Sequence, residues 1–209
     1  MKNLVLLILL LSMCFNCSTS KTVKSFKNPE TETFYTNKIL VIGMTADVDL
    51  RREFEKKVSK MLENNNVIAV KSIDFFEQSF VDNAKTIEEL NAIETQLLTA
   101  GFDAIILTKV TGKQEKVAFG DYYKNIEDKF KTFEDYYYKN QNICQNKDPE
   151  VYIVYSTQTT LYCICPDKER ELLWQANIEV AKTKNTQKNI SDYTKTLYYN
   201  LKENKLLIF

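Results

Sequence analysis

The 209-residue sequence contains no histidine and only four glycines. Without histidine, the chain has no Ser-His-Asp or Cys-His catalytic arrangement, no histidine-ligated metal site and no ordinary general base for neutral pH. The few glycines form neither a Gly-x-Gly-x-x-Gly nor a Gly-x4-Gly-Lys-Ser/Thr motif, so phosphate-cradling loops are not expected. These absences predict a protein that is not an enzyme and that carries no cofactor.

An excess of charge of either sign is also missing. Lys and Arg together number 28, and so do Asp and Glu. A nucleic-acid-binding protein usually shows a basic excess or a basic stripe, so no nucleic-acid partner is expected. The hydrophobic content of 44% is ordinary for a globular protein, and the length suits one domain.

The N-terminus has the pattern of a secretory signal. Lys2 precedes an apolar run from Leu4 to Leu11, and two cysteines, Cys14 and Cys17, follow. A membrane-spanning helix needs roughly twenty apolar residues, so this shorter run favours a cleaved signal peptide. We assign residues 1–16 to a lipoprotein signal peptide and lipid attachment to Cys17, with Cys14 as the alternative. A plain secreted protein is the remaining interpretation.

The residues after Cys17 bear on location. Ser18-Thr19-Ser20-Lys21 contains no acidic residue, whereas surface-export signals in Bacteroidetes-type lipoproteins usually place acids there. The sequence therefore favours a protein that is anchored by lipid in the outer membrane and faces the periplasm. The polar composition of residues 17–37 predicts a flexible tether between the anchor and the domain.

Residues 38–209 are expected to form a single α/β domain, with α+β as the alternative. Apolar runs and helical spacing predict strands at 39–42, 67–70 and 103–107, separated by helices at 50–62 and 86–98. Thr86 and Glu89 match a capping box at the start of the second helix. Short connections between these elements imply parallel strands joined by right-handed crossovers, a βαβαβ start to a two-layer or three-layer mixed sheet. In the first helix, Arg51 and Glu55 are expected on the solvent side.

The second half of the domain differs in composition. Residues 113–149 are rich in tyrosine and phenylalanine at helical spacing, which predicts a helical insertion. Two β-rich runs, 151–165 and 172–181, flank turn residues and predict a long β-hairpin. A C-terminal helix is expected at 190–201, with an apolar tail docked on the core.

Three further cysteines, Cys144, Cys163 and Cys165, leave several chemical states open. Buried free thiols are one. A disulfide from Cys144 to Cys163 or Cys165 is another, since export exposes the chain to an oxidising compartment. A metal site needs more ligands than these cysteines supply, so no metal is expected.

Several side chains are candidates for a binding role. Tyr122, Tyr123, Tyr136 and Tyr137 form a possible binding surface, because exposed aromatic residues are enriched in interfaces; packing of these rings within the domain is the alternative. Asp47 and Asp49 follow a strand and could hold a cation, but a helix cap together with an acid in the first helical turn explains them better. Trp174 is expected in the core. A glycosidase-like carboxylate pair is conceivable, but a solvated helix face explains these acids better: Asp121, Glu127, Asp128, Glu134 and Asp135.

Some of these segments are similar to a known group of proteins. Lys38-Ile39-Leu40-Val41-Ile42-Gly43, Phe102-Asp103-Ala104-Ile105-Ile106, Leu161-Tyr162 and Leu173-Trp174 resemble the N-terminal domain of TolB and the related domain of curli-secretion lipoproteins. The chain departs from that pattern by its tyrosine-rich insertion and by Pro166-Asp167 in the hairpin turn. The resemblance implies an envelope lipoprotein that serves as an assembly or partner-binding module. A carbohydrate- or small-ligand-binding lipoprotein that uses the aromatic stretch 119–138 is the alternative.

Overall fold

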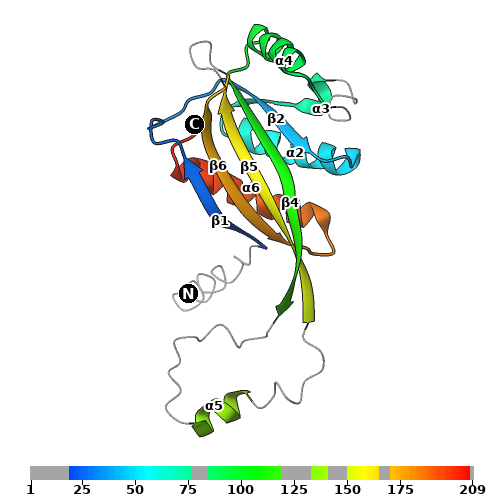
Figure 1. Ribbon diagram of the computed structural model, residues 1–209, viewed down its shortest axis with the longest axis vertical. Coiled ribbons are helices and arrows are strands. Elements are labelled where there is room, and N and C mark those ends of the chain that lie inside the picture. The colour runs from blue at the N-terminus through cyan, green and yellow to red at the C-terminus, as the bar shows by residue number, and fades with distance from the viewer. Residues whose placement is uncertain (1–18, 77–83, 119–132, 141–149, 165–169, 208–209) are drawn as a thin grey trace, which may run out of the picture.

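The computed structural model describes residues 19–76, 84–118, 133–140, 150–164 and 170–207. One mixed sheet of six strands, in the order β1-β6-β5-β4-β2-β3, forms the centre of the fold (Figure 1). The strands are β1 (Ser20–Lys27), β2 (Lys38–Met44), β3 (Ile68–Lys71), β4 (Ala104–Ala118), β5 (Glu150–Cys163) and β6 (Leu172–Ala181). The helices are α2 (Val48–Glu63), α3 (Ser72–Phe75), α4 (Ile87–Thr99), α5 (Phe133–Asn140) and α6 (Thr186–Glu203).

The expected βαβαβ start is confirmed. Strand β2 pairs in parallel with β3 on one side and with β4 on the other. Helix α2 connects β2 to β3, and α4 leads into β4. The predicted capping box is present, because Thr86 and Glu89 exchange side-chain-to-backbone hydrogen bonds, and Gly101 ends the helical segment with φ +78°.

The remaining strands are antiparallel. Strands β5 and β6 form the predicted hairpin, and β4 pairs antiparallel with β5. Strand β4 is much longer than the five residues expected at 103–107. The sequence does not predict its second half, because Lys109–Lys116 is exposed and polar and lacks the apolar run that identifies a strand. The fold class predicted from the sequence, a mixed-sheet α/β domain with a hairpin and a C-terminal helix, is confirmed.

The flexible tether expected over residues 17–37 is wrong for its central part. Ser20–Lys27 forms β1, which pairs antiparallel with β6 from Ser20↔Val180 to Lys27↔Trp174. Strand β1 lies at the edge of the sheet, and most of its side chains are exposed or half-buried. A polar edge strand is held mainly by its backbone ladder, so the composition of this segment does not reveal it.

The two faces of the sheet are covered unequally. Helices α2 and α6 pack on one face over the larger core, in which Trp174, Leu161 and Leu197 are fully buried. Helix α4 packs on the other face over a smaller core around Leu40 and Phe102 (Figure 1). On that second face, the antiparallel half of the sheet carries polar side chains such as Lys109 and Glu179. The expectation that Trp174 lies in the core is confirmed.

Of the cysteines, only Cys163 lies within the described residues. Cys163 is buried in the larger core and is disulfide-bonded, so the free-thiol interpretation is wrong for this residue. Its partner lies outside the described residues, as do Cys144 and Cys165.

Candidate functional site

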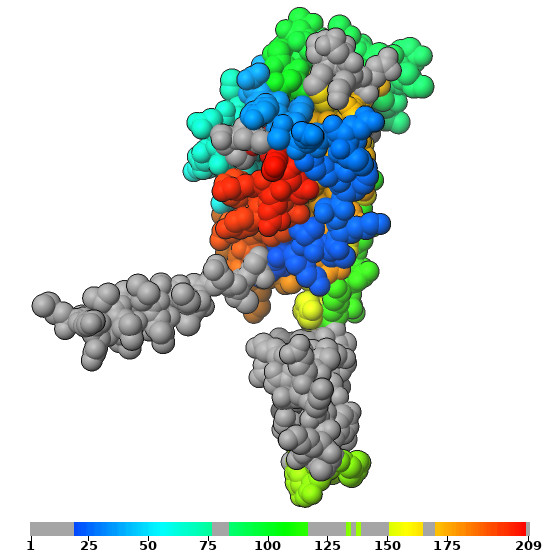
Figure 2. Space-filling model, turned by 90° about the vertical axis from the view of Figure 1, so that its left-hand side faces the viewer, coloured from blue at the N-terminus to red at the C-terminus, as the bar shows by residue number. Residues whose placement is uncertain are grey.

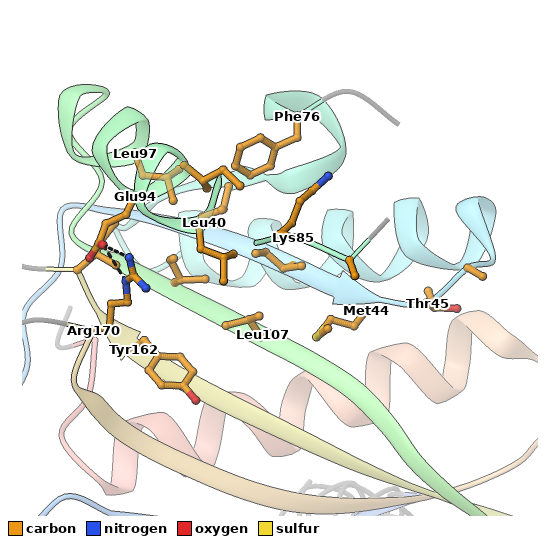
Figure 3. Close-up of a pocket in the computed structure, with 17 residues that line it drawn as sticks. Leu40, Met44, Thr45, Phe76, Lys85, Glu94, Leu97, Leu107, Tyr162 and Arg170 are labelled. Atoms are coloured by element: carbon orange, nitrogen blue, oxygen red, sulfur yellow. Dashed lines mark hydrogen bonds and ion pairs between the residues drawn. The ribbon is translucent and has the colours of Figure 1, made fainter. Parts of the chain in front are cut away.

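An apolar groove of about 960 Å³ lies between α4 and the lightly covered face of the sheet. Its floor is made by side chains that alternate along neighbouring strands, and its roof by one face of α4 (Figure 3). The floor residues are Leu40, Ile42 and Met44 of β2, Ile105 and Leu107 of β4, and Tyr162 of β5. Because β2, β4 and β5 are adjacent, these side chains form one continuous apolar surface.

The groove exists because α4 contacts the sheet mainly through its C-terminal half. Leu97 is buried, whereas Leu90 is 42% exposed and Ile87, one turn earlier, is 70% exposed. The apolar periodicity that predicts the helix therefore continues past the region where the sheet covers it. Two more exposed apolar side chains, Met44 and Val48, lie near the carboxyl end of β2. None of the described residues covers this part of α4, and an exposed apolar helix face at the mouth of a groove is typical of a binding site.

Charged groups mark the groove's edges. Arg170 donates from its guanidinium to Glu94, with N···O distances of 2.6 and 2.7 Å, and also to Asn91 (Figure 3). This contact ties the segment before β6 to α4 and closes one end of the groove. Lys85 lies at the rim on the other side. This role of Arg170 is not visible in the sequence, because the contact joins residues 76 positions apart.

A second hollow, of about 560 Å³, lies on the opposite face beside α6. Met44 and Thr45 line both hollows, so the carboxyl end of β2 separates them. Chain connections leave β2 and β3 over opposite faces of the sheet, and ligands of open α/β sheets commonly bind at such a switch point.

Asp47 and Asp49 lie at this edge, and both interact with residues of helix α2. The Asp47 carboxylate accepts a hydrogen bond from the Leu50 amide at 3.0 Å, which caps α2, and Asp49 forms an ion pair with Arg52 at 2.8 Å. Among the described residues, no group of three acidic or cysteine side chains is placed to hold a metal ion. The helix cap explains Asp47, and a first-turn position with an ion pair to Arg52 explains Asp49, as the sequence allowed.

A buried ion pair stiffens the same end of the sheet, and it corrects the expectation that Arg51 and Glu55 face solvent. They are 2% and 0% exposed, with an Nε···Oε1 distance of 3.0 Å. The Glu55 carboxylate also accepts from the Gly43 amide, the Ser72 hydroxyl and the Ile73 amide. This carboxylate therefore joins α2, the end of β2 and the start of α3, and all its contacts are internal.

The start of the described chain is also fixed by a carboxylate. Asp192 of α6 accepts hydrogen bonds from the Thr19 amide at 3.2 Å and from the Thr19 hydroxyl at 2.7 Å, and the Lys188 ammonium donates to it at 2.5 Å. Burial alone would raise the pKa of Asp192, but these donors bring it below its ordinary value. Thr19 is thus held on the domain two residues after Cys17.

The predicted tyrosine surface is described only in part. Tyr122 and Tyr123 lie outside the described residues, as do Cys14 and Cys17, and the side chain of Tyr136 is not described. Tyr137 lies on α5 and is 55% exposed, with its ring stacked 6.2 Å from that of Phe133. Figure 1 shows α5 far from α4, so Tyr137 and the groove belong to different surfaces.

Of the five acids considered for a glycosidase-like pair, only the side chain of Glu134 is described. It is exposed on α5, while Asp121, Glu127, Asp128 and Asp135 lie outside the described side chains. No pair among them can therefore be assigned. Within the described ranges, no helix is long and apolar enough to cross a bilayer.

Together these features define a mixed-sheet α/β domain with an apolar groove beneath one helix. No protein-family model and no curated protein matches the sequence. Solved structures with a similar chain path include the PelC dodecamer from Paraburkholderia phytofirmans, at 9% identity, with a TM-score of 0.44 over 85% of this chain and 94% of that chain.

Two others are named as lipoproteins. Lipoprotein GNA1162 from Neisseria meningitidis is 12% identical, with a TM-score of 0.41 over 79% of this chain and 95% of that chain. A minor lipoprotein from Acinetobacter baumannii is 7% identical, with a TM-score of 0.34 over 81% and 94% of the two chains. Similarities of this size do not transfer a function, and the specific likeness to TolB has no counterpart among these structures.

Proposed function

We propose that this protein is a lipid-anchored, non-enzymatic protein of the bacterial cell envelope whose domain binds an apolar segment of a partner protein in the groove beneath α4. The observation that carries the proposal is the apolar surface formed by α4 and strands β2, β4 and β5. The signal-like N-terminus supports the envelope location, and the absence of acids after Cys17 favours the periplasmic side of the outer membrane.

The shape of the apolar surface favours a protein partner over a small ligand. The cavity itself is within the size range of small-molecule sites. However, the apolar face of α4 continues outside it at Ile87, which is 70% exposed. A small ligand would leave this side chain uncovered, whereas a protein segment that extends past the groove would bury it.

The groove can be tested by photocrosslinking in intact cells. A photoreactive amino acid at Leu90 should yield a discrete protein adduct, because this side chain lies at the groove's mouth. The same amino acid at Tyr199, which is exposed on α6 across the sheet, is the matched control and should not give that adduct.

A second substitution makes the result specific. Leu107→Glu places a charge on the groove floor and should abolish the Leu90 adduct if the partner occupies the groove. An adduct with a lipid or another small molecule would favour the small-ligand alternative. Equal adducts from Leu90 and Tyr199 would contradict the proposed site.

The anchor is tested separately. Replacing Cys17 with serine should move nearly all of the protein from the membrane fraction to the soluble fraction, because the thiol that carries the lipid is lost. Cys14→Ser is the matched control and should leave the protein in the membrane fraction. If only Cys14→Ser releases the protein, the attachment site is Cys14, and if neither does, the lipoprotein assignment is wrong.

A further inference from the structure

The pairing register places the start of β1 and a protruding β-ribbon at the same end of the domain. Ser20 pairs with Val180, Val180 with Tyr155, and Tyr155 with Lys113, so these residues form one row across the sheet. Strands β1 and β5 both run antiparallel to β6, so both enter the sheet from this end.

Strands β4 and β5 continue beyond that row as a two-stranded ribbon. Their pairing extends from Gln114↔Val154 to Ala118↔Glu150, whereas β6 ends opposite Val154. Five residues of β4 therefore project past the row, which corresponds to roughly 16 Å at the rise of an extended strand. Figures 1 and 2 both place α5 beyond the tip of this ribbon.

The lipid anchor would hold this end close to the bilayer. Thr19 is fixed to Asp192, and an extended chain covers at most about 3.5 Å per residue, so Cys17 reaches no more than about 7 Å from Thr19. This reach is shorter than the projection of the ribbon. A lipid on Cys17, as in the proposed function on which this step rests, brings the ribbon tip and α5 to the membrane surface.

The side chains at this end have the chemistry of a membrane interface. Phe133, Tyr137 and Tyr138 of α5 are 82%, 55% and 60% exposed, and Val151 on the ribbon is 55% exposed. A helix of eight residues is not stable in water by itself, so α5 needs a surface against which to order. Tyrosine and phenylalanine favour the headgroup region, where an apolar ring and a polar hydroxyl are both accommodated.

We propose that α5 and the tip of the β4–β5 ribbon form a membrane-contact surface, in which Phe133, Tyr137 and Tyr138 insert into the headgroup region of the leaflet that holds the lipid anchor. Anchor and aromatic helix then act as two attachments. They orient the domain so that the opposite end, which carries the groove beneath α4, points away from the bilayer (Figure 1).

Fluorescence quenching by brominated lipids tests this orientation. The full-length, lipidated protein carrying Tyr137→Trp is reconstituted into phosphatidylcholine–phosphatidylglycerol vesicles with and without bromines high on the acyl chains. Native Trp174 is fully buried and supplies a constant background. Tyr35→Trp is the matched control: it is 69% exposed and precedes β2, whose Ile39 pairs with Ala104, roughly 45 Å along β4 from the tip.

We expect bromine to remove roughly a third or more of the total emission from the Tyr137→Trp protein and to leave the Tyr35→Trp protein unchanged, because an interfacial ring contacts the acyl-chain bromines. If neither is quenched while both float with the vesicles, the membrane-contact surface is wrong and the anchor stands. Quenching of both would contradict the orientation. If the proteins do not float with the vesicles, the anchor fails and this inference fails with it.

Discussion

Replacing Glu55 with alanine should lower the free energy of unfolding by about 3–5 kcal/mol, the usual effect of removing one partner from a buried ion pair. The substitution leaves the Arg51 guanidinium, which is 2% exposed, without its carboxylate. It also removes the acceptor of the Gly43 and Ile73 amides. Urea denaturation followed by circular dichroism measures the change.

A matched control and a second variant separate this mechanism from an effect on the helix. Glu53→Ala makes the same change two positions earlier in α2, at a half-buried side chain, and should alter stability by no more than about 0.5 kcal/mol. Adding Arg51→Met to Glu55→Ala removes the unpaired charge, so the double variant should be more stable than Glu55→Ala alone. Equal losses for Glu53→Ala and Glu55→Ala would contradict the role of the buried pair.

The same pair shows where reasoning from the sequence fails. A charged pair at positions i and i+4 of a helix is usually found on the solvent side, which is why the sequence predicts that Arg51 and Glu55 are exposed. Their burial depends on donors from two other segments, Gly43 of β2 and Ser72 and Ile73 of α3, that approach only in the folded chain. The apolar positions of the same helix, Val58 and Leu62, are buried as predicted.

The strands likewise include one that the sequence predicts and one that it does not. Strand β2 can be predicted because its central residues, Ile39 to Ile42, are buried on both faces and are therefore all apolar. Strand β1 was missed because it lies at the sheet edge, where backbone pairing with β6 fixes a segment with mostly exposed side chains. An edge strand needs no apolar pattern of its own, so its composition resembles that of a linker.

The groove could not be predicted because it results from how completely one helix covers a sheet. Leu90 and Leu97 are two helical turns apart, so the sequence places both on the apolar face of α4. In the structure Leu97 is 1% exposed, whereas Leu90 is 42% exposed. The difference depends on how α4 lies across β2 and β4, which is set by contacts distant in sequence. One such contact is the Arg170–Glu94 ion pair.

Raising the pH above 10 should destabilise the protein through Tyr193. This side chain of α6 is 3% exposed, and its hydroxyl lies 3.0 Å from that of Thr108 and also bonds to Thr159. Burial raises the pKa of Tyr193 to about 12, although the two threonine hydroxyls act in the opposite direction. In the unfolded chain the phenol has its ordinary pKa of 10.0.

The sign of the effect follows from these two values. Below pH 10 the phenol is protonated in both states, so the stabilisation is fully present. Between pH 10 and 12 the unfolded state loses its proton first, so stability falls as the pH rises, by up to about 2.7 kcal/mol above pH 12. At pH 11 the expected loss relative to pH 9 is about 1.4 kcal/mol.

Urea denaturation at pH 9 and pH 11 measures this loss, and Tyr193→Phe identifies its source. The variant should be about 1 kcal/mol less stable at pH 9, because it lacks the hydroxyl, while Thr108 and Thr159 still bond to each other at 3.1 Å. Between the two pH values it should lose about 1.4 kcal/mol less than the parent protein. Tyr199→Phe removes an exposed hydroxyl from the same helix and should keep the parent's pH dependence. If Tyr193→Phe keeps it too, the alkaline loss arises from other groups, and Tyr193 ionises as readily in the folded chain as in the unfolded one.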